Sequence, residues 1–277
     1  MFGDFALSLR ERSVDPVVQL MLRGFGTSNF LMSVLLGVVP TAIAMVFGPI
    51  VSYKSDRLRS RWGRRIPFLL IPTPIAALAM IGMAFCPHIA SGVQHLSDDA
   101  IGRKTALLIV FTFFWTCFEF ASVVAGSVFG GLINDVVPRP VIGRFFGLFR
   151  AVSLIDGIIF MWYIQGHAEE HFTLIFIWIA IVFGVGFTLM CLMVKEGEYP
   201  APAATVDDHR AGGFWAAVKV YFRDCFSQSH YRWIFAAFTL GALAANPINR
   251  WNLMYAKELQ LSIGQWDAAG PGWGEYR

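Results

Sequence analysis

Two long apolar runs are joined by a basic stretch, residues 52–67, which reads Ser-Tyr-Lys-Ser-Asp-Arg-Leu-Arg-Ser-Arg-Trp-Gly-Arg-Arg-Ile-Pro. An acidic residue, Asp56, ends the first run, and a dense series of arginines follows it. Gly63 permits a tight turn, and Pro67 suits the first turn of a following helix. Positive charge beside a membrane span explains the arginines but not Asp56, Trp62, Gly63 and Pro67. The stretch therefore indicates more than a topology signal.

The composition around this stretch is that of a membrane protein. The chain has 277 residues, of which 56% are hydrophobic and 15% are charged, whereas soluble domains carry roughly 25% charged residues. An ordinary cytosolic enzyme and a disordered protein are excluded. The apolar residues form runs of about 20, the length of a membrane-crossing helix. These runs predict an all-α polytopic membrane protein with spans at about 28–51, 67–86, 105–133, 145–165, 173–194 and 231–249.

Residues 1–24 predict a further helix, although five charged residues lie in their first fifteen positions. At 100° per residue, Asp4, Ser8, Glu11 and Asp15 fall within about 60° of one another, with Arg12 beside them. Such a polar stripe suits a spanning helix that lines a watery cavity, and we expect this helix to be cut short at its start. The alternative is a helix that lies on the membrane surface.

The basic residues of the connectors predict the orientation of the chain. Connectors 52–66, 134–144 and 195–230 hold most of the Lys and Arg, whereas 87–104 has only Arg103 and Lys104 and 166–172 has none. Cytoplasmic loops carry the excess of basic residues, so we expect the first three connectors to be cytoplasmic, in the inner cell membrane. Because the charge serves topology, no nucleic-acid partner is expected; the lipid bilayer is the expected surrounding.

The predicted organisation has three parts. Residues 1–194 form an N-terminal six-helix bundle, 195–230 a cytoplasmic linker with an amphipathic helix, and 231–277 a seventh helix with a truncated tail. Within the seventh helix, Asn246-Pro247-Ile-Asn249 is expected to break the backbone pattern and to offer amides to a cavity wall or to end the helix.

The basic stretch resembles the signature loop of the major facilitator superfamily. Ser60-Arg61-Trp62-Gly63 through Pro67 is similar to the longer loop of glycoside–pentoside–hexuronide:cation symporters and plant sucrose transporters. A second match is Asn134-Asp135 with the following Gly143-Arg144. The sequence departs from the general signature at Ser52, which replaces a glycine, and by four extra residues before Gly63. The resemblance covers residues 3 to 258, approximately.

This resemblance implies a secondary transporter of sugars or glycosides that works by alternating access of two six-helix bundles, with no enzymatic activity, cofactor or metal. The symporters bind a coupling cation at two aspartates that correspond by position to Ala44 and Gly48 here. The resemblance therefore favours a proton over sodium as the coupling cation. A superfamily transporter has about twelve helices, so we expect the chain to lack a C-terminal bundle.

The resemblance assigns a gating role to one group of residues. We expect Asp135 to pair with Arg57, Arg64 or Arg65. The predicted gating residues are Asp56, Arg57, Arg61, Gly63, Arg64, Arg65, Asp135 and Arg144.

Ionisable and amide side chains inside the spans are candidates for the substrate or ion pathway, because such residues are costly in the membrane. Glu119 is either a proton carrier or a structural partner of Arg10, Arg12 or Arg150. Trp115, Trp162 and Tyr163 either stack on a sugar or pack as ordinary apolar groups. The predicted pathway residues are Asp4, Glu11, Arg12, Asp15, Glu119, Arg150, Asn246 and Asn249.

Two other functions remain open. A superfamily relative that no longer transports could serve in assembly or sensing. More remotely, His167, Glu170 and His171 match the His-x-x-Glu-His pattern of one metallopeptidase group, although they occupy a short connector between two predicted spans.

Overall fold

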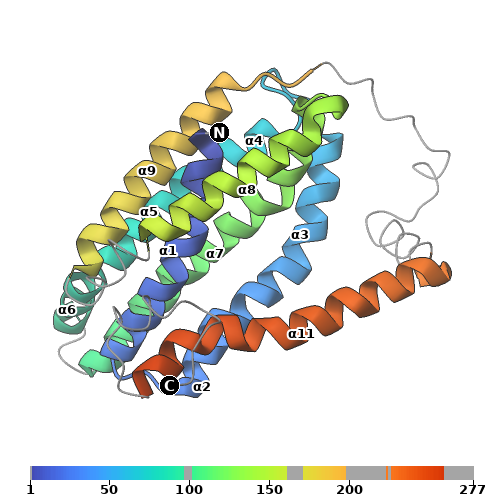
Figure 1. The fold of residues 1–277 in the computed structure, drawn as a ribbon. Helices are drawn as coiled ribbons and strands as arrows, with labels where there is room; N and C mark the ends of the chain where they lie inside the picture. Colours follow the sequence, from blue (N-terminus) through green and yellow to red (C-terminus); the bar gives the residue numbers. More distant parts are fainter. Residues whose placement is uncertain (1, 97–101, 161–170, 198–222, 224–225, 259–277) are drawn as a thin grey trace, which may run out of the picture. The chain divides into compact units, whose positions relative to one another are not determined.

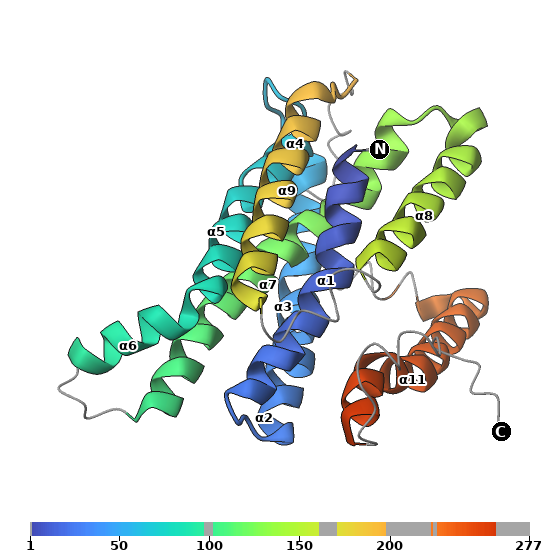
Figure 2. The same ribbon diagram turned by 60° about the vertical axis from the view of Figure 1, so that its left-hand side comes forward.

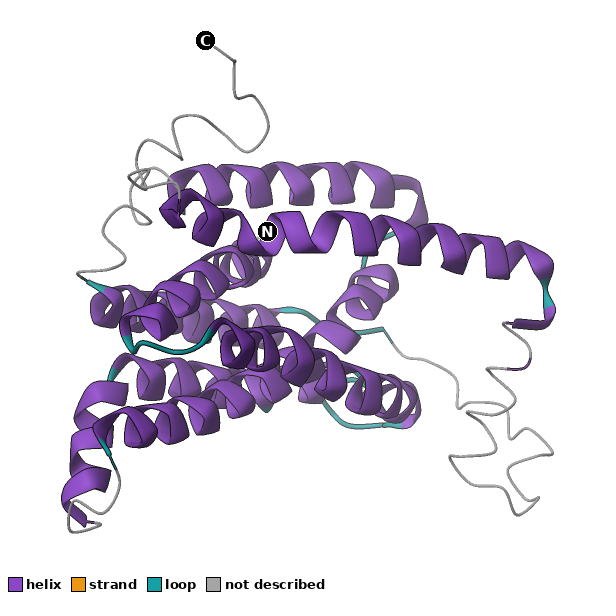
Figure 3. Ribbon diagram, turned by 90° about the horizontal axis from the view of Figure 1, so that it is seen from below, coloured by secondary structure: helices purple, strands orange, loops and turns teal. Residues whose placement is uncertain are grey.

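The regular elements in the part of the chain that the computed structural model describes are helices, and Figure 3 shows no strand in that part. The described residues are 2–96, 102–160, 171–197, 223 and 226–258. The structure divides into two compact units, Met1–Glu198 and Tyr199–Arg277. Each is described by itself.

The first unit is a bundle of helices joined by short connections (Figure 1). Its elements are α1 (Phe2–Gly24), α2 (Asn29–Ser33), η1 (Val34–Val38), α3 (Val39–Arg57), α4 (Ile66–Leu70), α5 (Pro72–Ala84), α6 (Cys86–Leu96), α7 (Arg103–Val136), η2 (Arg139–Val141), α8 (Ile142–Ile159) and α9 (Phe172–Met193). The second unit contains α11 (Ser229–Glu258).

The helix α7 holds the bundle together, because α3, α4, α5 and α6 all pack against it. Its buried face carries large aromatic side chains, among which Phe111 and Trp115 are fully buried and stack with ring centroids 5.9 Å apart. The indole Nε1–H of Trp115 donates to the carbonyl of Leu35, at 2.8 Å. Leu35 lies in η1, a π-helical turn, and such turns leave backbone groups outside the regular α-helical ladder. Trp115 is therefore a packing residue, and the sugar-stacking alternative is wrong for it.

The first helix lies inside the bundle and not on its surface. Figure 2 shows α1 between α9 and α8, and both helices pack against it. Ala6, Leu9, Val17 and Leu22 are no more than 1% exposed. A helix lying on the membrane surface would leave one face uncovered, so that alternative is excluded within this unit.

Two local predictions are corrected by the backbone. The connector 87–104 contains a helix, α6, which follows α5 after a bend at Phe85. In the second unit, α11 continues through Pro247, so the break expected around Asn246 and Asn249 is absent from the described backbone. A proline removes one hydrogen bond but can remain within a helix as a kink.

Four helical stretches among the described residues are long and apolar enough to cross a membrane: Asn29–Arg57, Ile66–Ala84, Arg103–Val136 and Phe172–Met193. Helix α1 carries six charged residues, and α8 carries three within its 18 residues, Arg144, Arg150 and Asp156. The fold is therefore that of an all-α polytopic membrane protein.

Candidate functional site: a charge cluster at one end of the bundle

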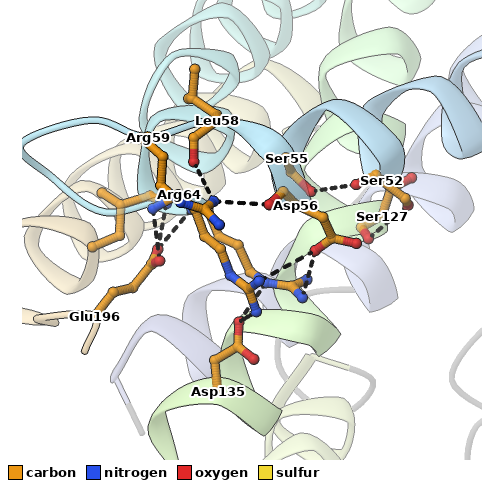
Figure 4. Close-up of polar contacts among 11 residues, drawn as sticks. Ser52, Ser55, Asp56, Leu58, Arg59, Arg64, Ser127, Asp135 and Glu196 are labelled. Atoms are coloured by element: carbon orange, nitrogen blue, oxygen red, sulfur yellow. Dashed lines mark hydrogen bonds and ion pairs between the residues drawn. The ribbon is translucent and has the colours of Figure 1, made fainter. Parts of the chain in front are cut away.

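The connector between α3 and α4 meets the end of α7 in a compact group of charges. Arg64 Nη2 and Arg65 Nε both donate to one carboxylate oxygen of Asp135, at 2.5 Å and 2.6 Å. All three side chains are less than one-fifth exposed. The predicted pairing of Asp135 with an arginine of the loop is confirmed, and two arginines share it (Figure 4). Ion pairs that are partly withdrawn from water are screened less by salt than exposed ones.

Asp56 completes the pairing from the other side. Its Oδ1 accepts from Arg65 Nη2 at 2.9 Å and lies 4.0 Å from Arg64 Nη1. The Asp56 side chain is 55% exposed, so this contact faces water and contributes less than the Asp135 contacts. The guanidinium of Arg65 also lies directly against Gly131 of α7, where any side chain would collide with it.

Glu196, just beyond α9, binds the backbone of the same loop. Its carboxylate accepts from the N–H groups of Arg64, Arg65 and Ile66, each at 2.8 Å. These N–H groups precede or begin α4, where a helix leaves its first donors without intrahelical partners. A carboxylate at this position satisfies them and opposes the positive end of the helix dipole. We refer to Asp56, Arg64, Arg65, Asp135 and Glu196 as the loop cluster.

Gly63 makes this approach possible. Its φ is +106°, a backbone conformation that only glycine adopts without strain. A Cβ built on Gly63 would lie 2.7 Å from Cδ of Glu196, so a side chain would displace the carboxylate. The turn is closed by Ser60, whose hydroxyl donates to the Gly63 carbonyl at 2.6 Å. The glycine that the sequence marked as a turn residue thus also admits Glu196.

The remaining predicted gating residues contact aromatic rings or are exposed. The guanidinium of Arg57 lies over the ring of Tyr53, 4.3 Å from its centroid, and Arg61 lies over Trp62 at 5.8 Å. Arg144, on the first turns of α8, is exposed. Ser52, which replaces the signature glycine, donates from its hydroxyl to the carbonyl of Ser127 at 3.4 Å and so links α3 to α7.

The predicted polar stripe of α1 is only partly exposed. Asp4 is 2% exposed and accepts from the hydroxyl of Ser8 at 3.4 Å. Glu11 is 57% exposed and pairs with Arg10 at 3.2 Å, whereas Asp15 is half-buried. Arg12 crosses to α8, where its Nε donates to the hydroxyl of Ser153 at 3.2 Å. The stripe is therefore divided between buried contacts at Asp4 and Ser8 and the exposed Glu11 in the middle of the helix.

The other pathway candidates are placed as follows. Glu119 is half-buried on α7, between the buried Phe118 and the exposed Phe120. The ring of Phe120 packs edge-on against Phe47 of α3. Arg150 is exposed on α8. An open groove of about 590 Å³ along α7 contains none of the predicted pathway residues, and its lining is Thr105, Leu108, Ile109, Thr112, Phe113, Thr116 and Cys117.

Several predictions fall outside the described part of the chain. Trp162, Tyr163, His167 and Glu170 belong to the undescribed residues 161–170. Most of the predicted amphipathic helix of 195–230 does so too. For Asn246 and Asn249 only the backbone of α11 is described. Their predicted roles stay predictions.

Two residues were missed by the sequence reasoning. Glu196 follows α9 in a polar segment, so its sequence is typical of an acid exposed to solvent. The only signal of a partner was that its connector and the basic loop are predicted to lie on the same side of the membrane. Asp156, which was not among the predicted pathway residues, is 1% exposed on α8. The spacing of Ser153, Asp156 and Gly157 on one helical turn was the available signal.

The fold is that of an integral, multi-pass membrane protein. The sequence model of the family described as MFS/sugar transport protein matches residues 21–256, which is most of the chain. The protein belongs to this family. No solved structure matches the chain.

Proposed function

We propose that the protein moves sugars or glycosides across the membrane by alternating access, coupled to protons, with the loop cluster as a gate at the cytoplasmic end. The family assignment over residues 21–256 supports the substrate class. The observation that carries the gate is the sharing of Asp135 by Arg64 and Arg65. These contacts join the loop between α3 and α4 to the end of α7.

The cluster suits a gate because it joins three chain segments at one end of the bundle (Figure 2). Asp56 ends α3, Asp135 lies near the end of α7, and Glu196 follows α9. In alternating access two bundles rock around a central site, so we propose that the first unit is one of these bundles. Contacts at the bundle end would then stabilise one of the two states, and their loss would change the balance between them.

The coupling cation is proposed from the residues of α3. Ala44 and Gly48 provide no carboxylate where sodium-coupled relatives have one, which supports a proton. Glu119 is the carrier candidate carried over from the sequence. Exchanging it for glutamine removes the titrating group and leaves the shape nearly unchanged.

Counterflow tests the function directly. Full-length protein in proteoliposomes loaded with an unlabelled sugar is given a panel of labelled mono- and disaccharides and glycosides. We expect at least one to accumulate transiently inside. A complete lack of counterflow over the panel would overturn transport and would favour a non-transporting relative. Where uptake occurs, Glu119→Gln should remove its pH dependence, and an unchanged pH dependence removes Glu119 from the role.

A further inference from the structure

One carboxyl group buried inside the bundle has no hydrogen-bond partner in the described structure. Asp156 is 1% exposed, and neither of its carboxylate oxygens has a hydrogen-bond partner among the described residues. An isolated carboxylate in apolar surroundings costs many kcal/mol, so such a group either pairs with a cation or becomes neutral. The geometry around Asp156 decides between these outcomes.

The charged groups that face Asp156 come from α1, the helix packed against α8. The charge of Arg12 acts on its carboxyl, and Asp4 is the second charged neighbour. Arg12 does not form an ion pair with Asp156 in the described structure; its Nε donates to the hydroxyl of Ser153, at 3.2 Å. Ser153 precedes Asp156 by three residues and lies on the same face of α8.

The Arg12 side chain is already at the turn of α8 that carries Asp156. A Cβ built on Gly157, the next residue, would lie 3.0 Å from Cδ of Arg12. The missing side chain of Gly157 therefore gives Arg12 its place against α8. The guanidinium that bonds to Ser153 therefore lies within one turn of Asp156 along α8.

We propose that Asp156 binds a proton in this state and that Arg12 replaces the proton when it is released. With the proton bound, the carboxyl is neutral and Arg12 stays on Ser153. On release the proton passes to water, and the carboxylate that remains draws the guanidinium away from Ser153. Exchange of a proton for a guanidinium keeps the buried carboxyl compensated in both states.

The same geometry disfavours a metal cation at this position. A sodium ion needs several oxygen ligands, whereas the positive guanidinium of Arg12 occupies the adjoining turn. A fixed positive charge at this range repels a metal ion in a low-dielectric site. A proton has no such requirement, because it binds covalently to one oxygen.

Infrared spectroscopy tests the site without any transport. The complete chain is purified into lipid nanodiscs, and the carbonyl stretch of protonated carboxyl groups is followed as the pH is raised. We expect a band that disappears on titration in the wild type and is missing from Asp156→Asn. The control Asp56→Asn, which changes an exposed aspartate, should keep it. An unchanged band in Asp156→Asn would overturn the proposal; circular dichroism checks that the variant is folded.

A second variant tests the exchange with Arg12. Ser153→Ala removes the hydroxyl that holds the guanidinium and leaves Asp156 in place. Arg12 is then free to pair with the carboxylate, so the band should disappear at a lower pH than in the wild type. An unchanged titration would show that Arg12 does not compete with the proton.

The coupling role of Asp156 rests on the proposed transport function. In proteoliposomes of the full-length protein, Asp156→Asn should retain counterflow but lose accumulation driven by a pH gradient. Retained accumulation would overturn the coupling role. If the wild type shows no counterflow either, transport itself fails, while the infrared titration still decides whether Asp156 binds a proton.

Discussion

The loop cluster and the interior of the α1–α8 contact differ in how their charged side chains are paired. In the loop cluster, two arginines share Asp135 at 2.5 and 2.6 Å, and a second acid, Asp56, supports them. Inside the bundle, Asp156 has no hydrogen-bond partner among the described residues. The neighbouring Arg12 bonds to a hydroxyl.

This difference in pairing suits the two regions to different roles. A cluster of paired charges stabilises one arrangement of the chain and stops doing so when the partners separate. A buried carboxyl group without a hydrogen-bond partner adds no such stability, but its protonation state responds to its surroundings. The comparison assigns the structural role to the loop cluster and the titrating role to the interior, and the following substitutions test this division.

Asp135→Ala should have the largest effect on stability, because it leaves two partly buried guanidinium groups with only an exposed acid. We expect a loss of about 2–3 kcal/mol in the free energy of unfolding, measured by detergent titration of the purified protein. The matched control is Asp56→Ala, which removes the exposed acid and should cost less than about 1 kcal/mol. Equal losses would mean that burial does not distinguish the two aspartates.

Glu196→Ala should come next. Three backbone N–H groups at 2.8 Å lose their acceptor, although water can reach some of them, so we expect a loss of about 1–2 kcal/mol. Glu196→Gln keeps an acceptor oxygen without the charge and should lose less. Lys195→Ala, at the exposed neighbouring position, is the control for changes in the segment after α9. A loss as large in Lys195→Ala as in Glu196→Ala would contradict the cap.

Gly63→Ala should destabilise the protein by about 1 kcal/mol, because the methyl group is strained at φ +106° and collides with Glu196. Gly197→Ala is the matched control, since a Cβ at Gly197 meets nothing within 4 Å. In the double variant with Glu196→Ala, part of the Gly63 effect should disappear, because the collision is gone. Strictly additive losses would show that the two residues act independently.

Much of the fold could be predicted from apolar run length alone. Runs of about 20 apolar residues have few stable alternatives to a spanning helix, and the long helices α3, α7 and α9 lie where the runs predicted them. The helix α6 was missed because Pro87, Gly92 and polar residues make its sequence typical of a connector. The opposite error occurred at Pro247, where a helix break was predicted and α11 continues. A proline signals a possible kink but not where a helix ends.

The part of the site that could be predicted is the pairing of opposite charges at one end of the bundle. Asp135 and the loop arginines lie in connectors assigned to the same side, so their pairing could be expected. The contacts of Glu196 and of Arg12 depend on how α9 and α1 are rotated in the bundle, and a single sequence does not specify helix rotation when every face carries apolar residues. The same rotation buries Asp156.

The smallest effect on the free energy of unfolding is expected for a substitution of Arg10. This substitution gives the sharpest test of the difference between charged residues of the interior and those of the loop cluster. The guanidinium is 5.6 Å from the ring centroids of both Phe118 and Phe183, and Arg10 is 6% exposed. Arg10→Met removes two cation–π contacts but also the cost of burying a charge, and it adds apolar contact to both rings. Its acidic partner Glu11 is 57% exposed and loses little.

We therefore expect Arg10→Met to change the free energy of unfolding by less than about 1 kcal/mol, whereas Arg64→Met, measured in the same detergent titration, should destabilise clearly. Arg64 is similarly buried, at 17% exposure, but it gives up a direct bond to Asp135 and leaves that carboxylate partly uncompensated. If Arg10→Met lowers the free energy of unfolding as much as Arg64→Met does, the interior cation contributes as much stability as a cation of the loop cluster. The contrast between the two regions would then not hold.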